Sequence, residues 1–259
     1  MSKIEWTDIT KNPVKGKCPT ACPYCYARQM YDDNKWDPSI RFQPEVLDDL
    51  PKKPCRVFVG STMELFLFPE WMPAIIDRCR QHPEHTFIFL TKKPDELLKY
   101  SPFPANCEVG VSATHGIRLS KACDWLMDVE ASVKFVSVEP FIGSFQHLTR
   151  HWFVNAGVKW VIIGAMTGRK GKLLEMQKHY YYAKLRLEKL DAVGRKWTLL
   201  PDLERVREVI VAADDAGARV FIKDNLYKLM MEAPAEDHDL YWEDMSTLRQ
   251  ELPDRRVTV

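Results

Sequence analysis

The sequence lacks an excess of charge of either sign, long apolar runs and an apolar leader. Its 259 residues include 37 Lys and Arg against 36 Asp and Glu, so the net charge is +1. This balance excludes a chain that coats nucleic acid through uniform positive charge. Apolar runs such as Trp160–Ala165 are far shorter than the ~20 residues of a membrane-spanning helix, which predicts no membrane association. The first residues, Met-Ser-Lys-Ile-Glu-Trp, contain no signal region, so we expect a cytoplasmic protein.

The sequence also lacks a cysteine pattern typical of secreted domains. Seven cysteines are an odd number, and nothing else suggests secretion, so reduced thiols or metal ligands are expected instead of a disulfide framework. A hydrophobic content of 46% is enough to bury a sizeable core and excludes a disordered chain. The length suits one large domain or two small ones.

Short, continuous apolar runs alternate with amphipathic segments along the chain. Runs of this kind are typical of parallel strands buried on both faces, and they lie at Arg56–Gly60, Thr86–Leu90, Glu108–Val111, Lys134–Val138, Lys159–Gly164 and Arg219–Ile222. The intervening segments have helical spacing, namely Trp71–His82, Ile117–Val129 and Asp202–Ala216. This alternation predicts an α/β fold, which we assign as a partial (β/α)6 barrel with its chemistry at the carboxyl ends of the strands.

Two segments of opposite charge interrupt this alternation. Residues 169–196 carry nine basic and three acidic residues, whereas 232–259 carry eight acids and three arginines. We therefore predict a barrel domain over 1–231, with a basic helical insertion at about 168–200, and an acidic C-terminal extension over 232–259.

Three cysteines lie within eight residues, at Cys18, Cys22 and Cys25. Gly16 and two prolines favour a loop here, and a helix begins at about residue 26, which places Cys25 near a positive helix end that favours thiolate. A closed zinc site needs four ligands, and the nearest further candidates in sequence are Cys55, His82 and His85. Three cysteines on a [4Fe-4S] cluster instead leave one iron open for chemistry. Both metal centres are compatible with the residues alone.

The spacing Cys-x3-Cys-x2-Cys, with Tyr24 before the last cysteine, resembles the radical S-adenosylmethionine (SAM) superfamily. The motifs IEWTDxTxNPV, CYA, FVGSTMELF, FLTKKP, VGVS, SVEP and WVIIGAMTG resemble a narrower group, the phage-type radical SAM proteins, which are distantly related to spore photoproduct lyase. This resemblance covers about residues 3–165, and Arg219–Asp224 is similar to a late FFxK strand of that group. It implies a barrel of radical SAM type, a [4Fe-4S] cluster on the three cysteines, and reductive cleavage of S-adenosylmethionine to a 5′-deoxyadenosyl radical. A reductant such as flavodoxin or ferredoxin is implied as partner.

The resemblance also implies a set of groups that bind the cosubstrate after the strands. Ser61, Thr62 and Glu64 would receive the methionine amino group, although the same residues suit a helix cap. Lys92 would hold the carboxylate, with a solvated lysine as the alternative. Ser112 would contact the ribose, and Glu139 would bind a ribose hydroxyl or the substrate. Gly164 and Tyr24 would lie by the adenine. As alternatives, Gly164 suits a tight turn and Tyr24 would cover the cluster from water.

The substrate is less well indicated. Aromatic and basic residues interleave at Tyr181, Lys184 and Arg186, a composition that suits stacking on a single-stranded or flipped nucleotide. The alternative is an amphipathic helix over this segment with its lysines in solvent. We predict a radical SAM enzyme that acts on nucleic acid or a nucleotide. The competing hypothesis is a non-catalytic, metal-stabilised nucleic-acid-binding protein. No role is assigned to Cys55, Cys79, Cys107 or Cys123.

Overall fold

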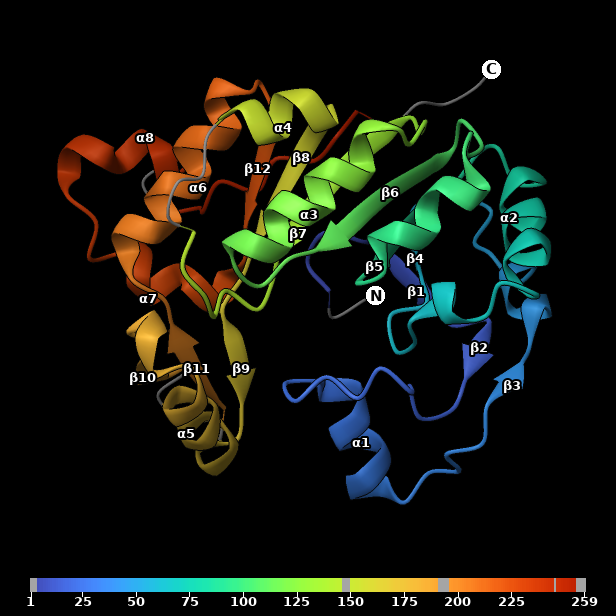
Figure 1. Ribbon diagram of the computed structural model, residues 1–259, viewed down its shortest axis with the longest axis horizontal. Helices are drawn as coiled ribbons and strands as arrows, with labels where there is room; N and C mark the ends of the chain where they lie inside the picture. Colours follow the sequence, from blue (N-terminus) through green and yellow to red (C-terminus); the bar gives the residue numbers. More distant parts are fainter. Residues whose placement is uncertain (1–3, 146–149, 191–195, 245, 255–259) are drawn as a thin grey trace. The chain divides into compact units, whose positions relative to one another are not determined.

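A computed structural model describes residues 4–145, 150–190, 196–244 and 246–254 (Figure 1). Seven strands form the main sheet, in the order β1-β4-β5-β6-β7-β8-β12, and the four pairings with a given register are parallel. The strands are β1 (Ile9–Lys11), β4 (Arg56–Val59), β5 (Thr86–Thr91), β6 (Cys107–Ser112), β7 (Val133–Val138), β8 (Val158–Ile163) and β12 (Arg219–Ile222). Each of the six predicted strands is present, which confirms that continuous Val, Ile and Phe runs mark doubly buried strands.

The chain forms two compact units. The first holds the described residues up to 111, with 128–134 and 254, and the second holds 112–127 and the described residues of 135–253. The first unit contains α1 (Tyr26–Asn34), α2 (Met72–Arg80) and a two-stranded antiparallel sheet of β2 (Val14–Lys15) and β3 (Arg41–Phe42). The 3-10 helices among its described residues are η1 (Pro44–Leu47), η2 (Leu65–Leu67) and η3 (Pro94–Tyr100). The predicted boundary at residue 231 stays a prediction.

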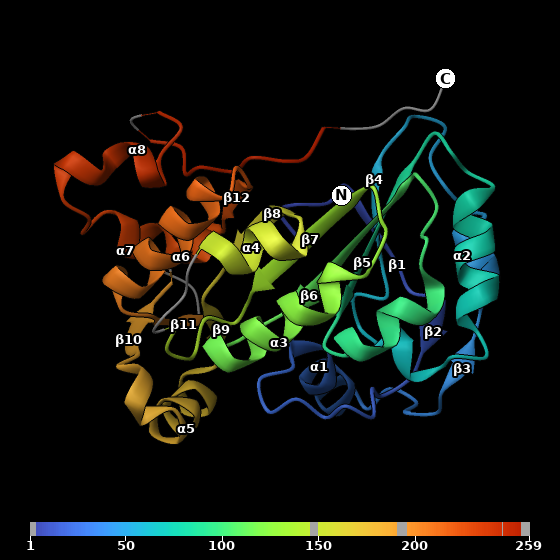
Figure 2. The same cartoon turned by 45° about the horizontal axis from the view of Figure 1, so that its top comes forward.

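In the second unit, α3 (Gly116–Met127), α4 (Arg150–Ala156) and α6 (Leu203–Asp215) lie side by side (Figure 2). The predicted helix over 202–216 is confirmed, because Asp202 caps α6 by accepting a hydrogen bond from the Glu204 N–H. Its Val206, Val209 and Ile210 are buried, as the apolar spacing predicts. The short helices that follow are η5 (Asp224–Leu226), α7 (Tyr227–Met230), η6 (Ala235–Asp237) and α8 (His238–Tyr241).

The basic insertion differs from the helical segment that its sequence predicts. Among the described residues of the insertion, α5 (Lys170–His179) and the short η4 (Tyr181–Ala183) are the helical segments. Helix α5 packs on an antiparallel sheet of β10 (Arg186–Lys189), β11 (Trp197–Leu200) and β9 (Met166–Gly168) (Figure 1). The amphipathic-helix interpretation is therefore wrong beyond residue 183. Leu187 lies in β10 and is only partly buried, and a short apolar pattern of this kind does not distinguish a helix from a strand.

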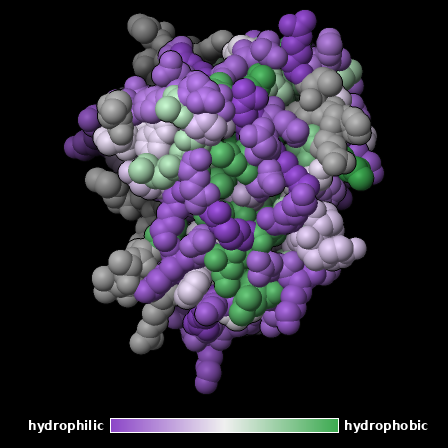
Figure 3. All heavy atoms as spheres, turned by 90° about the vertical axis from the view of Figure 1, so that its left-hand side faces the viewer, coloured by the Kyte–Doolittle hydropathy of each residue, from purple (hydrophilic) through white to green (hydrophobic). Residues whose placement is uncertain are grey.

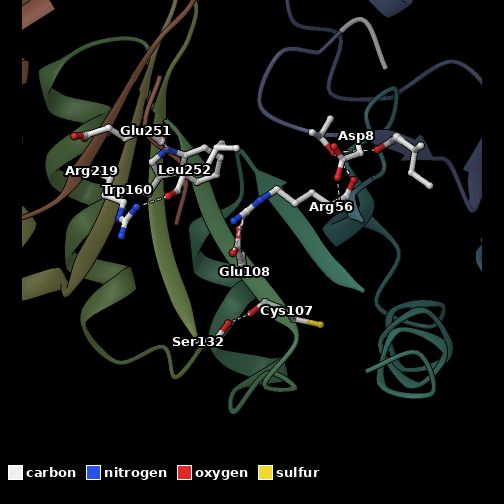
Figure 4. A network of polar contacts seen from close by, with 11 residues as sticks. Asp8, Arg56, Cys107, Glu108, Ser132, Trp160, Arg219, Glu251 and Leu252 are labelled. Atoms are coloured by element: carbon white, nitrogen blue, oxygen red, sulfur yellow. Dashed lines mark hydrogen bonds and ion pairs between the residues drawn. The ribbon is translucent and has the colours of Figure 1, made fainter. Parts of the chain in front are cut away.

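The acidic segment after residue 232 lies against the edge of β12. The Ile222 N–H donates to the Arg249 carbonyl oxygen, and the Glu251 N–H donates to that of Val220. The Trp160 indole also donates to the Glu251 carbonyl oxygen at 2.9 Å, and Figure 4 shows this contact. The segment thus satisfies the outer hydrogen-bonding groups of an edge strand.

A buried ion pair lies at the amino-terminal ends of the strands in the first unit. Arg56 begins β4, and its Nη1 contacts both Glu108 carboxylate oxygens, at 3.1 and 3.0 Å (Figure 4). The two side chains are only 2% and 3% exposed. Asp8 accepts the Arg56 N–H at 2.7 Å, so backbone and side chain of this arginine are both held.

No helix among the described residues is long and apolar enough to cross a bilayer.

Candidate active site at the carboxyl ends of the strands

The three clustered cysteines are free thiols on the loop between β2 and α1, and each is partly exposed. Cys25 is the N-cap residue of α1, and its Sγ accepts the Arg28 N–H at 3.4 Å. The predicted helix start at residue 26 is confirmed. The Cys25 side chain therefore lies at the amino-terminal end of α1, which is the positive end of the helix dipole.

The thiol loop is fastened to α1 and to the segment that follows it. Arg28 Nη1 donates to the Cys18 carbonyl oxygen, and the Gly16 N–H donates to the Tyr31 hydroxyl, both at 2.9 Å. Gly16 has φ +118°, and a Cβ there would lie 2.6 Å from the Ser39 carbonyl oxygen. Only glycine fits this close approach, so the turn that presents the cysteines is specified by sequence.

The three thiols share one electrostatic environment. Burial raises the pKa of the Cys22 thiol most, the Lys92 ammonium lowers it, the Cys25 and Cys18 sulfurs raise it, and a hydrogen bond with Tyr24 lowers it. Among the described residues, no three Cys, His, Asp or Glu side chains are close enough together to hold one metal ion. In a cluster each thiolate binds a different iron, whereas ligands around one tetrahedral zinc have sulfurs about 3.8 Å apart. Three free thiols from one loop are the donor set that a [4Fe-4S] cluster with one open iron takes.

The residues considered as a fourth zinc ligand, Cys55, His82 and His85, lie at the amino-terminal end of β4, away from the thiol loop. Cys55 precedes β4 and its Sγ is 3.3 Å from His85 Nδ1, while His82 and His85 each contact Glu84. The thiol loop instead meets the carboxyl end of β4, where the Tyr26 hydroxyl donates to the Ser61 carbonyl oxygen at 2.9 Å. The four residues of β4 separate these ends by about 13 Å. These side chains therefore cannot complete a closed zinc site on the motif.

Ser61 and Thr62 follow β4 after Gly60, and both form hydrogen bonds with Asn12. Asn12 Oδ1 accepts from the Ser61 hydroxyl, the Thr62 hydroxyl and the Thr62 N–H, each at 3.2 Å. Asn12 itself follows β1, so two adjacent strand ends are joined. Sequence reasoning missed Asn12 as a site residue, although it belongs to the quoted NPV motif.

Glu64, which follows β4, is hydrogen-bonded to the carboxyl end of the neighbouring strand β5. Its carboxylate accepts from the Thr91 hydroxyl at 2.5 Å and from the Lys92 N–H at 2.8 Å. Burial raises the pKa of Glu64, and the hydrogen bonds from Thr91 and Lys92 and the Lys92 charge oppose that rise. The helix-cap alternative for Ser61 and Thr62 is wrong, since η2 begins after Glu64 and has no side-chain cap. Thr91 is the last residue of β5, one residue beyond the predicted strand, and its role in holding Glu64 was not predicted.

A second group of polar side chains lies in the second unit. Ser112 ends β6, and its hydroxyl donates to the Glu139 carbonyl oxygen at 3.1 Å. The Glu139 carboxylate pairs with Lys223 Nζ at 2.6 Å, beside Gly164. Lys223 was not singled out from sequence, although it is the lysine of the FFxK-like strand. Asn225 was also missed, and it exchanges two hydrogen bonds of 2.9 Å with the Ala165 backbone.

The predicted substrate residues are exposed, but one of them is paired. Tyr181 is 79% exposed, and Lys184 follows in a left-handed turn with φ 53°. Arg186 pairs with Glu232 and lies 3.4 Å from Glu188, so its charge is largely compensated. Cys79 and Cys123 are buried in α2 and α3, and burial raises the pKa of Cys123 to about 12. Such thiols are inert packing groups.

The chain is similar to known proteins in sequence family and in fold. A family model described as "Protein of unknown function (DUF5131)" matches residues 1–188, and the chain belongs to this family. No curated protein matches it. A solved structure of spore photoproduct lyase complexed with dinucleoside spore photoproduct is similar, with 13% identity over 81% of this chain and 75% of that one and a TM-score of 0.52. A mutant of that lyase with bound AdoMet and the same dinucleoside has 13% identity, 81% and 74% coverage and a TM-score of 0.51.

This likeness establishes the fold. The predicted α/β class and the partial barrel of radical SAM type are confirmed, as is the predicted likeness to spore photoproduct lyase. The cysteine loop follows β2, and most of the candidate cosubstrate residues lie at or just after the carboxyl ends of strands of the parallel sheet. Parallel sheets carry their functional sites at this end.

Proposed function

We propose that this protein is a radical SAM enzyme. Cys18, Cys22 and Cys25 would hold a [4Fe-4S] cluster and leave its fourth iron open for S-adenosylmethionine. The observation that carries this proposal is the set of three free, partly exposed thiols on one loop whose last member caps α1. Bound there, the cluster would supply the electron that breaks the bond between sulfur and C5′, which yields methionine and a 5′-deoxyadenosyl radical.

The roles of the protein side chains follow from their chemistry. The Ser61 and Thr62 hydroxyls and the Glu64 carboxylate offer oxygen acceptors to the methionine ammonium, and Lys92 offers a cation to its carboxylate. Ser112 would serve the ribose, and Tyr24 and Gly164 would lie by the adenine. The Asn12 and Thr91 contacts hold these groups before ligand arrives, which lowers the entropy cost of binding.

The electron donor we propose is reduced flavodoxin or ferredoxin, and the substrate we propose is a nucleic acid or nucleotide. The dinucleoside bound by the similar lyase supports the substrate class. Tyr181 and Tyr182 support it too, because they are 79% and 50% exposed and offer stacking faces near Lys184. Figure 3 views the side with α5, β10 and α7, where hydrophilic side chains cover most of the surface around a hydrophobic strip.

Anaerobic reconstitution with iron and sulfide tests the chemistry. We expect a brown protein with about four irons per chain and dithionite-dependent formation of 5′-deoxyadenosine. Cys22→Ala should lose both, whereas the matched control Cys123→Ala, which removes a buried thiol outside the motif, should keep both. A colourless protein that binds one zinc would instead support the non-catalytic nucleic-acid-binding alternative.

Oligonucleotide binding at several salt concentrations tests the substrate class. Tyr181→Ser should weaken binding of single strands about tenfold or more through lost stacking. Lys184→Gln should lower the salt dependence by about one phosphate contact. Lys121→Gln, an exposed lysine on α3, is the control and should change neither quantity. Equal binding by all three variants would exclude this surface.

A further inference from the structure

The segment that carries the three clustered cysteines is joined at both ends to one peptide unit. Asn12 precedes this segment, and its Oδ1 accepts a hydrogen bond from the Thr62 N–H at 3.2 Å. Tyr26 follows the last of the cysteines, and its hydroxyl donates to the Ser61 carbonyl oxygen at 2.9 Å. The carbonyl group of Ser61 and the N–H of Thr62 belong to the same peptide unit. Residues 13–25 thus form a loop whose two flanking side chains close on the Ser61–Thr62 peptide.

The two contacts fix the plane of this peptide unit. The Ser61–Thr62 bond is not among the cis peptide bonds of the structure, and in a trans peptide the C=O and N–H groups point in opposite directions. Tyr26 and Asn12 therefore hold the unit from opposite sides. Asn12 also accepts the hydroxyls of Ser61 and Thr62, each at 3.2 Å. The orientation of these two hydroxyl-bearing residues is set jointly by Asn12 and Tyr26.

The turn that leads from β4 into this peptide is held from its own side as well. The Gly60 N–H donates to the Lys11 carbonyl oxygen at 2.8 Å, and the Met63 N–H donates to the Gly60 carbonyl oxygen at 3.2 Å. Gly60 has φ +81°, and a Cβ there would lie 2.5 Å from Leu65 Cγ. Glycine is therefore needed at this turn both for its conformation and for space. The turn is built from β4, and the Tyr26 hydroxyl relates it to the cysteines.

Folding stability does not explain the Tyr26 contact. Tyr26 is 52% exposed, and an exposed hydroxyl that can also bond to water contributes little net stability. Helix α1 buries one of its nine residues, Ala27, whereas α2 buries four of nine. Apolar packing therefore holds α1 less than it holds α2. Hydrogen bonds such as that of Tyr26 have a correspondingly larger share in placing α1, and the Cys25 thiol at its start, relative to the end of β4.

We propose that Tyr26 positions the Ser61–Thr62 peptide relative to the three cysteines. The inference rests on the proposed function and deepens it, because it takes the Ser61 and Thr62 hydroxyls to hold the amino-acid end of the cosubstrate. That end must reach the metal centre and these hydroxyls at the same time. A contact that fixes the two loops before binding lowers the entropy cost of bringing them together. Tyr26 acts through the Ser61 carbonyl group and is a positioning residue.

Hydrogen–deuterium exchange of the full-length protein tests the contact without cluster or ligand. Tyr26→Phe removes one hydroxyl and keeps the ring. We expect the Thr62 N–H to exchange about 2–10-fold faster in this variant, which is the ratio that one net hydrogen bond is worth. Tyr227→Phe is the matched control, because Tyr227 lies on α7 and is 43% exposed. It should leave exchange at Thr62 unchanged.

The same variants are then compared for S-adenosylmethionine binding after anaerobic reconstitution to equal iron content. Tyr26→Phe should retain the cluster and raise the Kd about 2–10-fold, and Tyr227→Phe should change neither. Asn12→Ala should also raise the Kd. Because Asn12 and Tyr26 hold one peptide unit, the double variant should lose less affinity than the product of the two single losses.

The inference is overturned if Tyr26→Phe exchanges at Thr62 at the wild-type rate, or if exchange rises while the Kd stays at the wild-type value. Loss of iron in Tyr26→Phe would assign the tyrosine to the metal site instead, and a double variant equal to the product would show independent contacts. Failure of the proposed function differs, since the wild-type protein would then hold the cluster and bind no S-adenosylmethionine. Exchange at Thr62 still tests the Tyr26 contact in that case.

Discussion

Two ion pairs join residues of the parallel sheet, and they differ in almost every physical respect. Arg56–Glu108 lies at the amino-terminal ends of the strands, uses both carboxylate oxygens and is 2–3% exposed. Lys223–Glu139 lies at carboxyl ends, uses one carboxylate oxygen and is 14–26% exposed. The first pair is satisfied within the protein, whereas the second has an oxygen in reserve. This contrast separates a group that holds the fold from a group available to a ligand.

The largest expected effect is on the buried pair. Arg56→Met leaves the Glu108 carboxylate buried without its partner, so we expect the free energy of unfolding to fall by about 3–5 kcal/mol. Urea denaturation measures this loss. The double variant Arg56→Met/Glu108→Leu removes both charges and should recover most of it. A single variant as stable as the wild type would show that the pair does not hold the fold.

A smaller loss is expected from filling the gap under the second pair. Gly164→Ala introduces a methyl group against Lys223 and Glu139, with an expected cost of about 1–3 kcal/mol. Gly171→Ala in α5 is the control, because nothing lies within 4 Å of its Cβ position, and it should stabilise by roughly 0.4–1 kcal/mol. Thermal unfolding compares the two. Equal stability in both variants would contradict the packing described at Gly164.

The buried carboxylate of Glu64 gives a pH-dependent effect. Because burial raises its pKa in the folded protein, the folded state retains the proton better than the unfolded chain does. Its stability contribution is complete below the unfolded pKa of about 4.3 and is lost as the pH rises through the folded pKa. Denaturation of wild type and Glu64→Gln across this window should show their difference declining with pH. A difference that grows with pH would contradict the raised pKa.

The smallest effect on stability is expected for Lys223→Met. The pair is partly exposed, so its loss should cost less than about 1 kcal/mol. The melting temperature should therefore change little. A loss as large as that of Arg56→Met would make the pair a structural clamp and remove the contrast with the buried pair.

The sequence predicted the sheet well because its strands are buried on both faces. Runs such as Arg219–Ile222 coincide with a strand of the structure, and the cap at Asp202 predicted the start of α6. The insertion was predicted less well. Leu173 and Leu187 are compatible with helical spacing, but the second lies in β10, and a short apolar pattern cannot distinguish these periods.

The candidate site was predicted at the level of strand ends and motifs. Position after a strand, together with the family resemblance, selected Ser61, Lys92 and Glu139, since carboxyl ends of parallel strands share one edge. Their partners Asn12 and Lys223 come from segments 49 and 84 residues away in sequence. Such pairings depend on strand order and side-chain reach, which one sequence does not encode locally.

The most direct test of the central claim is electron paramagnetic resonance of the reduced, reconstituted protein before and after S-adenosylmethionine is added. Three thiolates and one open iron predict a [4Fe-4S] signal that changes on addition, with both the signal and its change absent in Cys18→Ala, Cys22→Ala and Cys25→Ala. A cluster signal that S-adenosylmethionine leaves unaltered, or that survives loss of any of these thiols unchanged, would contradict the account.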